Sequence, residues 1–186
     1  MGGLAAVGAV PSDASAATAP GILDGLQGDG ELLQRIAGIE QLIAAAYEHV
    51  ISTISLSSAA ASGLRLFLSH ERTHVQLLSK ALTPLGETPP VPPSDIHAVS
   101  RELESLHGSG SLIDVRHEQD ALPYLVGVET VAEDAYYSSI SMLSDQRLVV
   151  LAAQILSCEA QHWSALNELF SPGDIKRAVP YPVVLG

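Results

Sequence analysis

The feature that most constrains this fold is a set of polar side chains that occurs twice at matched spacing. In each copy a Glu is followed seven residues later by a Tyr, and after a longer gap by Glu-x-x-His. The two Glu lie 31 positions apart in one copy and 30 in the other. The copies are Glu40, Tyr47, Glu71 and His74, and then Glu129, Tyr136, Glu159 and His162. Such a repeat predicts two helix pairs of one design, related by a pseudo-twofold axis.

Apolar residues recur at helical spacing through most of the chain, and no segment shows the alternation typical of a half-buried β-strand. Between the second and third predicted helices, the stretch TPPVPPSD excludes regular helix because proline lacks a backbone N–H. Ser94 or Asp95 is a candidate N-cap for the short third helix, and Asp145 for the last. SLSSAAAS is predicted to be a short turn after the first. The predicted helices cover residues 30–55, 60–82, 96–106, 118–143 and 146–170.

The lengths of the connections predict how the four long helices are wired. A short connection joins the first two long helices and another joins the last two, whereas a long connection links the two pairs. A long middle crossover is the wiring of ferritin-like bundles, while a simple up-and-down bundle has three short loops. We therefore predict an all-α chain with a ferritin-like four-helix bundle over residues 29–172. Residues 1–28 are expected to be a disordered tail or the remnant of an export signal, and residues 173–186 an extended Pro-rich tail.

All four glutamates of the repeat are predicted to face the apolar interior. The residues three and four positions before a helical residue share its face. For each Glu these positions hold only apolar residues: Ile36 and Ala37, Phe67 and Leu68, Leu125 and Val126, and Ile155 and Leu156. A buried, unpaired carboxylate costs several kcal/mol, and four together also repel one another. Metal cations between them would remove both penalties.

Four Glu and two His form a set of donors that suits a pair of iron ions or, alternatively, manganese ions. The imidazoles disfavour magnesium and calcium, while zinc stays chemically possible. Glu71 and Glu159 are expected to bridge the two ions, with Glu40 and Glu129 as terminal ligands. The predicted ligands are Glu40, Glu71, His74, Glu129, Glu159 and His162. The alternative for each Glu-x-x-His pair is a surface or salt-bridged position, but two matched pairs, each with a partner Glu on an apolar face, favour metal.

A Glu on the first and third long helices, with Glu-x-x-His on the second and fourth, resembles the signature of ferritin-like di-metal carboxylate proteins over about residues 30–170. Two stretches are similar to those of bacterial ferritin-like domain proteins related to desiccation-associated proteins: His70-Glu71-Arg72-Thr73-His74-Val75 and Glu159-Ala160-Gln161-His162. This resemblance implies ferroxidase, peroxide-consuming or oxidase chemistry at two iron ions, with dioxygen or peroxide as partner. Two manganese ions would imply catalase-like dismutation. It also implies a role in stress protection.

The sequence is also compatible with two other classes of function. One is a non-enzymatic bundle with a structural or vestigial metal site and a stress-protective role. The other is a hydroxylase with an organic substrate, although no sequence feature specifies one. The chain lacks the paired cysteines that deliver electrons in rubrerythrins, since Cys158 is its single cysteine. Whether the protein is an enzyme is therefore left undecided by the sequence.

Several further residues near the repeat receive plainer interpretations. Tyr47 and Tyr136 are expected to lie in the bundle core with hydrogen-bonded hydroxyls rather than to take part in redox chemistry. Glu133, one turn after Glu129, is expected to be a solvated flank rather than a ligand. His70 is expected to lie off the site, because the preceding position on a helix is rotated by about 100°. Cys158 is interpreted as a buried small residue.

Composition excludes some partners. With 9 basic and 21 acidic residues the net charge is −12, whereas nucleic-acid binding requires clustered Lys and Arg. No segment reaches the roughly 18–20 apolar residues of a membrane span. The apolar start and Ala14-Ser15-Ala16 resemble part of an export signal but lack its basic region, so export to the periplasm or cell surface is only slightly favoured. A monomer or homodimer is expected, because the tail after Phe170 does not resemble the fifth helix of cage ferritins.

Overall fold

The computed structural model describes residues 21–106 and 110–179, and within them the chain forms helices and no strand. The four long helices are α1 (Gly28–Thr53), α2 (Ser58–Leu82), α4 (Glu118–Met142) and α5 (Gln146–Phe170). The shorter elements are η1 (Thr83–Leu85), α3 (Ile96–Ser105), η2 (Leu112–Asp114) and α6 (Ile175–Ala178). The all-α prediction is confirmed, and each predicted helix begins and ends within two residues of its observed bounds.

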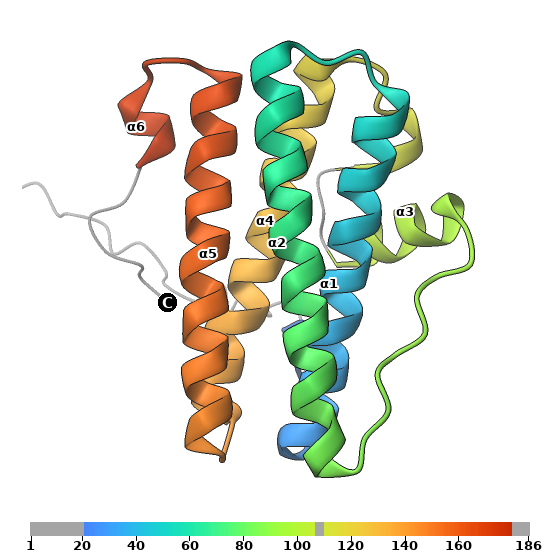
Figure 1. The fold of residues 1–186 in the computed structure, drawn as a ribbon, viewed down its shortest axis with the longest axis vertical. Coiled ribbons are helices and arrows are strands. Elements are labelled where there is room, and N and C mark those ends of the chain that lie inside the picture. Colours follow the sequence, from blue (N-terminus) through green and yellow to red (C-terminus); the bar gives the residue numbers. More distant parts are fainter. Residues whose placement is uncertain (1–20, 107–109, 180–186) are drawn as a thin grey trace, which may run out of the picture.

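The long helices pack as two antiparallel hairpins, α1 with α2 and α4 with α5 (Figure 1). Each hairpin has a short loop, over residues 54–57 and 143–145. The two hairpins pack together through α1 against α4 and α2 against α5. Each hairpin carries one copy of the sequence repeat, so the two copies face each other inside the bundle.

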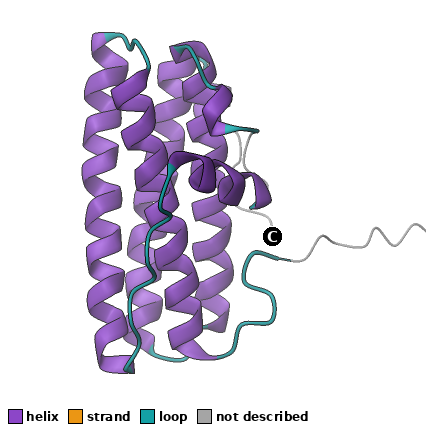
Figure 2. Cartoon of the chain, turned by 90° about the vertical axis from the view of Figure 1, so that its right-hand side faces the viewer, coloured by secondary structure: helices purple, strands orange, loops and turns teal. Residues whose placement is uncertain are grey.

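The long connection returns the chain along the length of the bundle, so that α2 and α4 run in the same direction (Figures 1 and 2). Two glutamines of α1 hold its Pro-rich part. Gln34 Nε2 donates to Glu87 Oε2 at 2.9 Å and to the Thr88 carbonyl at 3.0 Å, and Gln41 Nε2 donates to the Pro90 carbonyl at 2.9 Å. These side chains supply partners for a segment that prolines keep out of regular helix. The predicted crossover is confirmed.

Side-chain caps explain where several helices begin. Asp95 accepts from the Ala98 N–H at 2.9 Å and Asp145 accepts from the Arg147 N–H at 2.8 Å, as the sequence indicated. The predicted turn SLSSAAAS is shorter than expected, because the Ser57 hydroxyl accepts from the Ala60 N–H at 3.3 Å and α2 begins at Ser58. The tail is also not wholly extended, since α6 forms after Asp174 accepts from the Arg177 N–H.

The apolar core consists of two clusters stacked along the bundle. One contains Ile43 and Tyr47, and the other contains Ile36 and Tyr136. Glu40 lies between Ile36 and Ile43 on the same buried stripe of α1. The polar residues of the repeat therefore occupy the boundary between two apolar regions, which enclose them from both ends.

Most of the predicted N-terminal tail, together with residues 107–109 and 180–186, lies outside the described residues. Among the helices that are described, none is long and apolar enough to cross a membrane.

Asp29 at the start of α1 should contribute measurably to stability. Its carboxylate accepts from the backbone N–H groups of Ser144 and Asp145, at 2.8 and 2.9 Å, and so ties the two hairpins at one end. We expect Asp29→Ala to lower the free energy of unfolding by about 1–2 kcal/mol in urea titrations. The exposed Glu102, replaced by Ala as a control, should change it by less than about 0.5 kcal/mol. Equal effects of the two substitutions would contradict this role of Asp29.

Candidate metal centre

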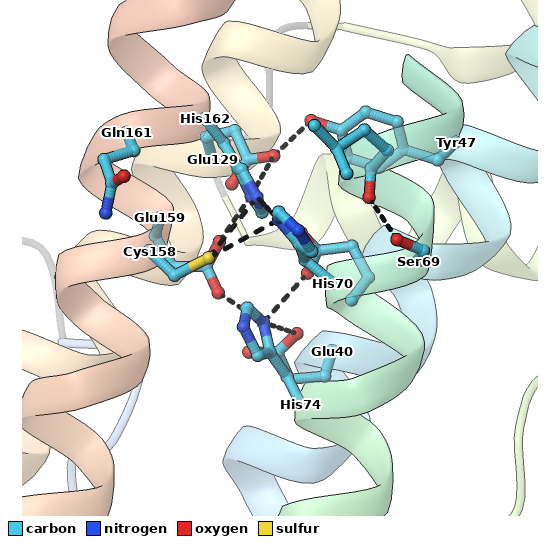
Figure 3. A network of polar contacts seen from close by, with 12 residues as sticks. Glu40, Tyr47, Ser69, His70, His74, Glu129, Cys158, Glu159, Gln161 and His162 are labelled. Carbon is cyan, nitrogen blue, oxygen red and sulfur yellow. Dashed lines mark hydrogen bonds and ion pairs between the residues drawn. The ribbon is translucent and has the colours of Figure 1, made fainter. Parts of the chain in front are cut away.

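The structure brings all six predicted ligands together in the middle of the bundle. α1 supplies Glu40, α4 supplies Glu129, and the Glu-x-x-His pairs come from α2 and α5. The helical i, i+3 spacing places Glu and His of each pair on one inward face. All four glutamates are 0% exposed, and His74 and His162 are 5% and 1% exposed. Figure 3 shows the side chains converging from the four helices.

The six residues form two overlapping groups of four. One group consists of Glu40, Glu71, His74 and Glu159, and the other of Glu71, Glu129, Glu159 and His162. In each group one ligand atom of every residue lies within 4.8 Å of the others. Glu71 and Glu159 belong to both groups. This sharing is the geometry that two ions bridged by two carboxylates would need.

The shortest contacts between histidines and carboxylates cross from one hairpin to the other. His74 Nδ1 lies 2.8 Å from Glu159 Oε1, and His162 Nδ1 lies 2.9 Å from Glu71 Oε1. Longer approaches, from His74 Nδ1 to Glu40 Oε2 and from His162 Nδ1 to Glu129 Oε1, both measure 3.6 Å. Each imidazole thus turns Nδ1 toward the carboxylates of both hairpins.

Many of these close atoms nevertheless lack a hydrogen-bond partner. His74 Nδ1 and Glu159 Oε1 lie 2.8 Å apart, yet neither atom has a hydrogen-bond partner. Buried polar groups are almost always hydrogen-bonded, and each exception requires an explanation. The unsatisfied atoms of the site are Glu40 Oε2, Glu71 Oε1 and Oε2, His74 Nδ1, Glu129 Oε2 and Glu159 Oε1. Metal ions placed among them would satisfy all six, so the residues present fit a pair of cations.

Two tyrosines hold the terminal carboxylates from the opposite hairpin. The Tyr47 hydroxyl donates to Glu129 Oε1, and the Tyr136 hydroxyl donates to Glu40 Oε1. Both tyrosines are fully buried, as are the glutamates that they contact. The sequence predicted hydrogen-bonded core tyrosines, and this is confirmed. It did not predict that each tyrosine bonds the glutamate of the other repeat.

Burial and crowding change the pKa values of the carboxyl groups in opposite directions. Burial, reinforced by the negative charges of Glu159 and Glu71, raises the pKa of Glu40 well above its usual range. Burial likewise raises the pKa of Glu129. Burial also acts to raise the pKa of Glu71, but the close imidazoles of His162 and His74 outweigh it and lower that pKa to about 2. Protons are therefore favoured on the two terminal glutamates.

The imidazoles are favoured in their protonated form. Burial acts to lower the pKa of His74, but the surrounding carboxylates outweigh it and raise the pKa well above its usual range. The same balance raises the pKa of His162 to about 12. A site with both terminal carboxyl groups and both imidazoles protonated would hold four such protons. Those protons carry the same charge as two divalent cations.

Three further residues lie next to the six ligands, and the sequence predicted their positions with different success. Glu133 belongs to neither group of four and is half-buried, with a pKa raised to about 7 chiefly by burial. His70 lies off the carboxylates as predicted, but its Nδ1 is 2.9 Å from His162 Nε2. Cys158 is half-buried rather than buried, with Sγ 3.5 Å from His162 Nε2. The sequence missed this contact, although His70 and Cys158 hold the same repeat position, one residue before Glu71 and Glu159.

Removal of either tyrosine hydroxyl should destabilise the metal-free protein. Tyr47→Phe would leave Glu129 Oε1 buried without a donor, and Tyr136→Phe would do the same to Glu40 Oε1. Each should lower the free energy of unfolding by about 1–3 kcal/mol in urea titrations. Tyr137→Phe is a matched control, because Tyr137 follows Tyr136 in sequence but is 50% exposed. Equal stability of all three variants would refute a stabilising role for the hydrogen bonds of Tyr47 and Tyr136.

Comparison with known proteins agrees with this fold. A family model described as a ferritin-like domain matches residues 28–172, while no curated protein matches the chain. One similar solved structure is the bacterioferritin-related protein from Bacteroides fragilis, described as a dodecameric thioferritin. It is 19% identical with a TM-score of 0.63, and the match covers 86% of this chain and 96% of that chain. At this identity the likeness concerns the fold alone. The family match spans most of the chain, which therefore belongs to the ferritin-like domain family.

Proposed function

We propose that this protein binds two metal ions, iron or alternatively manganese, and uses them to oxidise ferrous iron or to consume dioxygen or peroxide in stress protection. One observation carries the proposal. Six polar atoms of the buried ligands, which form two overlapping groups of four, have no hydrogen-bond partner. Burial of such atoms in an apolar bundle is energetically unfavourable unless a cation binds to them.

The residues divide into distinct roles under this proposal. Glu71 and Glu159 belong to both groups and would bridge the two ions. Glu40 with His74, and Glu129 with His162, would complete one ion each. Tyr47 and Tyr136 would hold the terminal carboxylates in place by their hydrogen bonds. When bound, a pair of redox-active ions would supply electrons to dioxygen or peroxide.

The protein itself supplies a dry, pre-arranged and charge-balanced environment. The apolar clusters on both sides keep water from the carboxylates, which are fully buried. Before metal arrives, protons on Glu40, Glu129, His74 and His162 offset the charge of the cluster. Two divalent cations can replace them without a change of net charge. The six ligands would therefore keep their arrangement when metal binds.

A structural metal site is the second candidate, favoured by the complete burial of all four glutamates. Such a site would join the hairpins through Glu71 and Glu159 without reacting with dioxygen or peroxide. Under this reading the protein is a stress-protective bundle and not an enzyme. Turnover of the bound metal distinguishes the two candidates.

Metal uptake should release protons. Ligands bind metal in their deprotonated form, and four of the six have raised pKa values in the metal-free protein. Because protons compete with metal at these groups, affinity for Mn²⁺ should rise as the pH is raised from about 6 to about 8. Calorimetric titrations in two buffers of different ionisation enthalpy would count the protons released. Metal binding without proton release at any pH in this range would contradict the charge balance.

The oxidation proposal can be tested with ferrous iron. Metal-free protein is loaded anaerobically and exposed to air, and ferric absorbance in the near ultraviolet is followed. We expect two irons per chain and rapid oxidation, slowed at least about tenfold in Glu129→Gln, because even loss of a residue behind a ligand costs about 10- to 100-fold. Glu133→Gln is the matched control, one turn further along α4 and outside both groups of four.

Two results would decide against oxidation. Binding of two irons that oxidise no faster than iron in buffer would favour the structural site. Equal rates in Glu129→Gln and Glu133→Gln would place the reaction away from the buried cluster. Either result would leave the family and the fold unchanged.

The cellular location and the assembly of the protein are also proposals. We propose export to the periplasm or cell surface over a cytoplasmic location, as the N-terminal sequence suggests, and a monomer or homodimer as the assembly. The Bacteroides fragilis protein with a similar fold is described as dodecameric. Size-exclusion chromatography with light scattering would determine which assembly this chain adopts.

A further inference from the structure

A second group of ligand atoms lies directly outside the buried carboxylates. It consists of His70 on α2 and of Cys158 and His162 on α5, and we call these three residues the outer cluster. His70 Nδ1 is 2.9 Å from His162 Nε2, and Cys158 Sγ is 3.5 Å from His162 Nε2 and 3.7 Å from His70 Nδ1. Figure 3 shows the sulfur and the two rings meeting beside Glu159.

The repeat explains why these residues meet. His70 precedes Glu71 and Cys158 precedes Glu159, so the two hold equivalent positions on the facing helices α2 and α5. Each side chain leaves its helix about 100° around the axis from the inward glutamate that follows it. On both helices this direction leads to the same side of the bundle. Cys158 and His162 are also four residues apart, which places them on one face of α5.

His162 separates the two groups of ligands. Its Nδ1 lies 2.9 Å from Glu71 Oε1 on the inner side, while its Nε2 faces His70 and Cys158 on the outer side. The rings of His70 and His162 are stacked, with centroids 5.2 Å apart and planes 14° apart. His162 can therefore offer one nitrogen to each group without turning.

The separations in the outer cluster are close to those of a tetrahedral site. Zinc bonds of about 2.3 Å to sulfur and 2.0–2.1 Å to nitrogen at tetrahedral angles place sulfur and nitrogen about 3.5 Å apart, and two nitrogens about 3.4 Å apart. The observed sulfur–nitrogen distances of 3.5 and 3.7 Å agree with this. The nitrogens, at 2.9 Å, would have to separate by about 0.5 Å. His70 is half-buried, so its ring is not fully enclosed by the bundle.

Burial and charge also suit a cation here. His70 and Cys158 are half-buried while His162 is buried, so a fourth coordination position is within reach of solvent. Four carboxylates neutralise two divalent cations, and a filled inner site would therefore not repel a third ion by net charge. Thiolate with imidazole is a softer set of donors than the carboxylates inside, and it selects zinc-class ions over manganese.

We propose that the outer cluster is a third metal site, which binds one thiophilic divalent cation through Cys158 Sγ, His70 Nδ1 and His162 Nε2. On binding, Cys158 would give up its thiol proton and the His162 imidazolium its Nε2 proton, both to solvent. If the inner site is also filled, the Nδ1 proton of His162 would leave for solvent as well, and the ring would then offer one nitrogen to each site. The proposal does not depend on the inner metal pair, because His70 and Cys158 belong to neither carboxylate group.

Cobalt is the probe for this site, because a thiolate ligand gives Co²⁺ an intense near-ultraviolet charge-transfer band that carboxylate and imidazole ligands do not. Metal-free, reduced full-length protein is titrated with Co²⁺. We expect the intensity of this band at saturation to correspond to one thiolate-bound Co²⁺ per chain, whatever further Co²⁺ the carboxylates bind, and the band to be absent in Cys158→Ser. In His70→Gln the affinity read from the band should fall at least about tenfold.

The design separates this site from the inner one. Glu40→Gln changes an inner ligand whose group of four does not include His162, and it should keep the thiolate band at unchanged affinity. Loss of the band in Glu40→Gln would refute an independent outer site. So would the absence of the band in the unaltered protein, or equal cobalt affinity in His70→Gln. In those cases the 2.9 Å contact of His70 serves only to orient the His162 ring.

Discussion

Burial of four carboxylates in the middle of an apolar bundle is the constraint on which the rest of this structure depends. Glutamates with 0% exposure are stable only where positive charge reaches them, because desolvation of even one costs several kcal/mol. Two imidazoles lie within reach of the carboxylates, and the raised pKa values of Glu40 and Glu129 favour protons on those two groups. Such protons would supply positive charge in an exchangeable form, since the same places can be taken by cations. Under the proposed function, metal binding would thus be a substitution within an existing electrostatic balance.

The duplicated sequence is what brings these groups together. Each hairpin contributes one terminal Glu and one Glu-x-x-His pair, and neither hairpin can satisfy its own polar groups. Tyr47 bonds Glu129 of the other hairpin, Tyr136 bonds Glu40, and each imidazole approaches the Glu of the opposite Glu-x-x-His pair. These contacts therefore also hold the two hairpins together. The long crossover, secured on α1 by Gln34 and Gln41, allows the hairpins to face each other in this way.

Much of this architecture could be read from the sequence, because periodicity and spacing are local properties. The helices, the crossover and the meeting of Glu40, Glu71, His74, Glu129, Glu159 and His162 all follow from them. Contacts across the bundle could not be predicted in the same way. The partner of Tyr47 depends on how far the hairpins slide past each other, which no local pattern fixes. His70 was expected off the site and Cys158 was interpreted as a buried small residue, so their meeting was not predicted, although they hold equivalent positions in the repeat. The helix α6 was missed because the prolines near it predicted extended chain.

The central claim is that the buried carboxylates exist to hold a pair of metal ions. A crystal structure of protein loaded with Mn²⁺ or Fe²⁺, with anomalous scattering measured at the metal edge, tests it most directly. Two peaks about 3.5–4 Å apart, with Glu71 and Glu159 contacting both, would agree with the claim. A single peak, or none among the four glutamates, would contradict it. The cluster would then be a buried network of protons and imidazolium ions that stabilises the bundle alone.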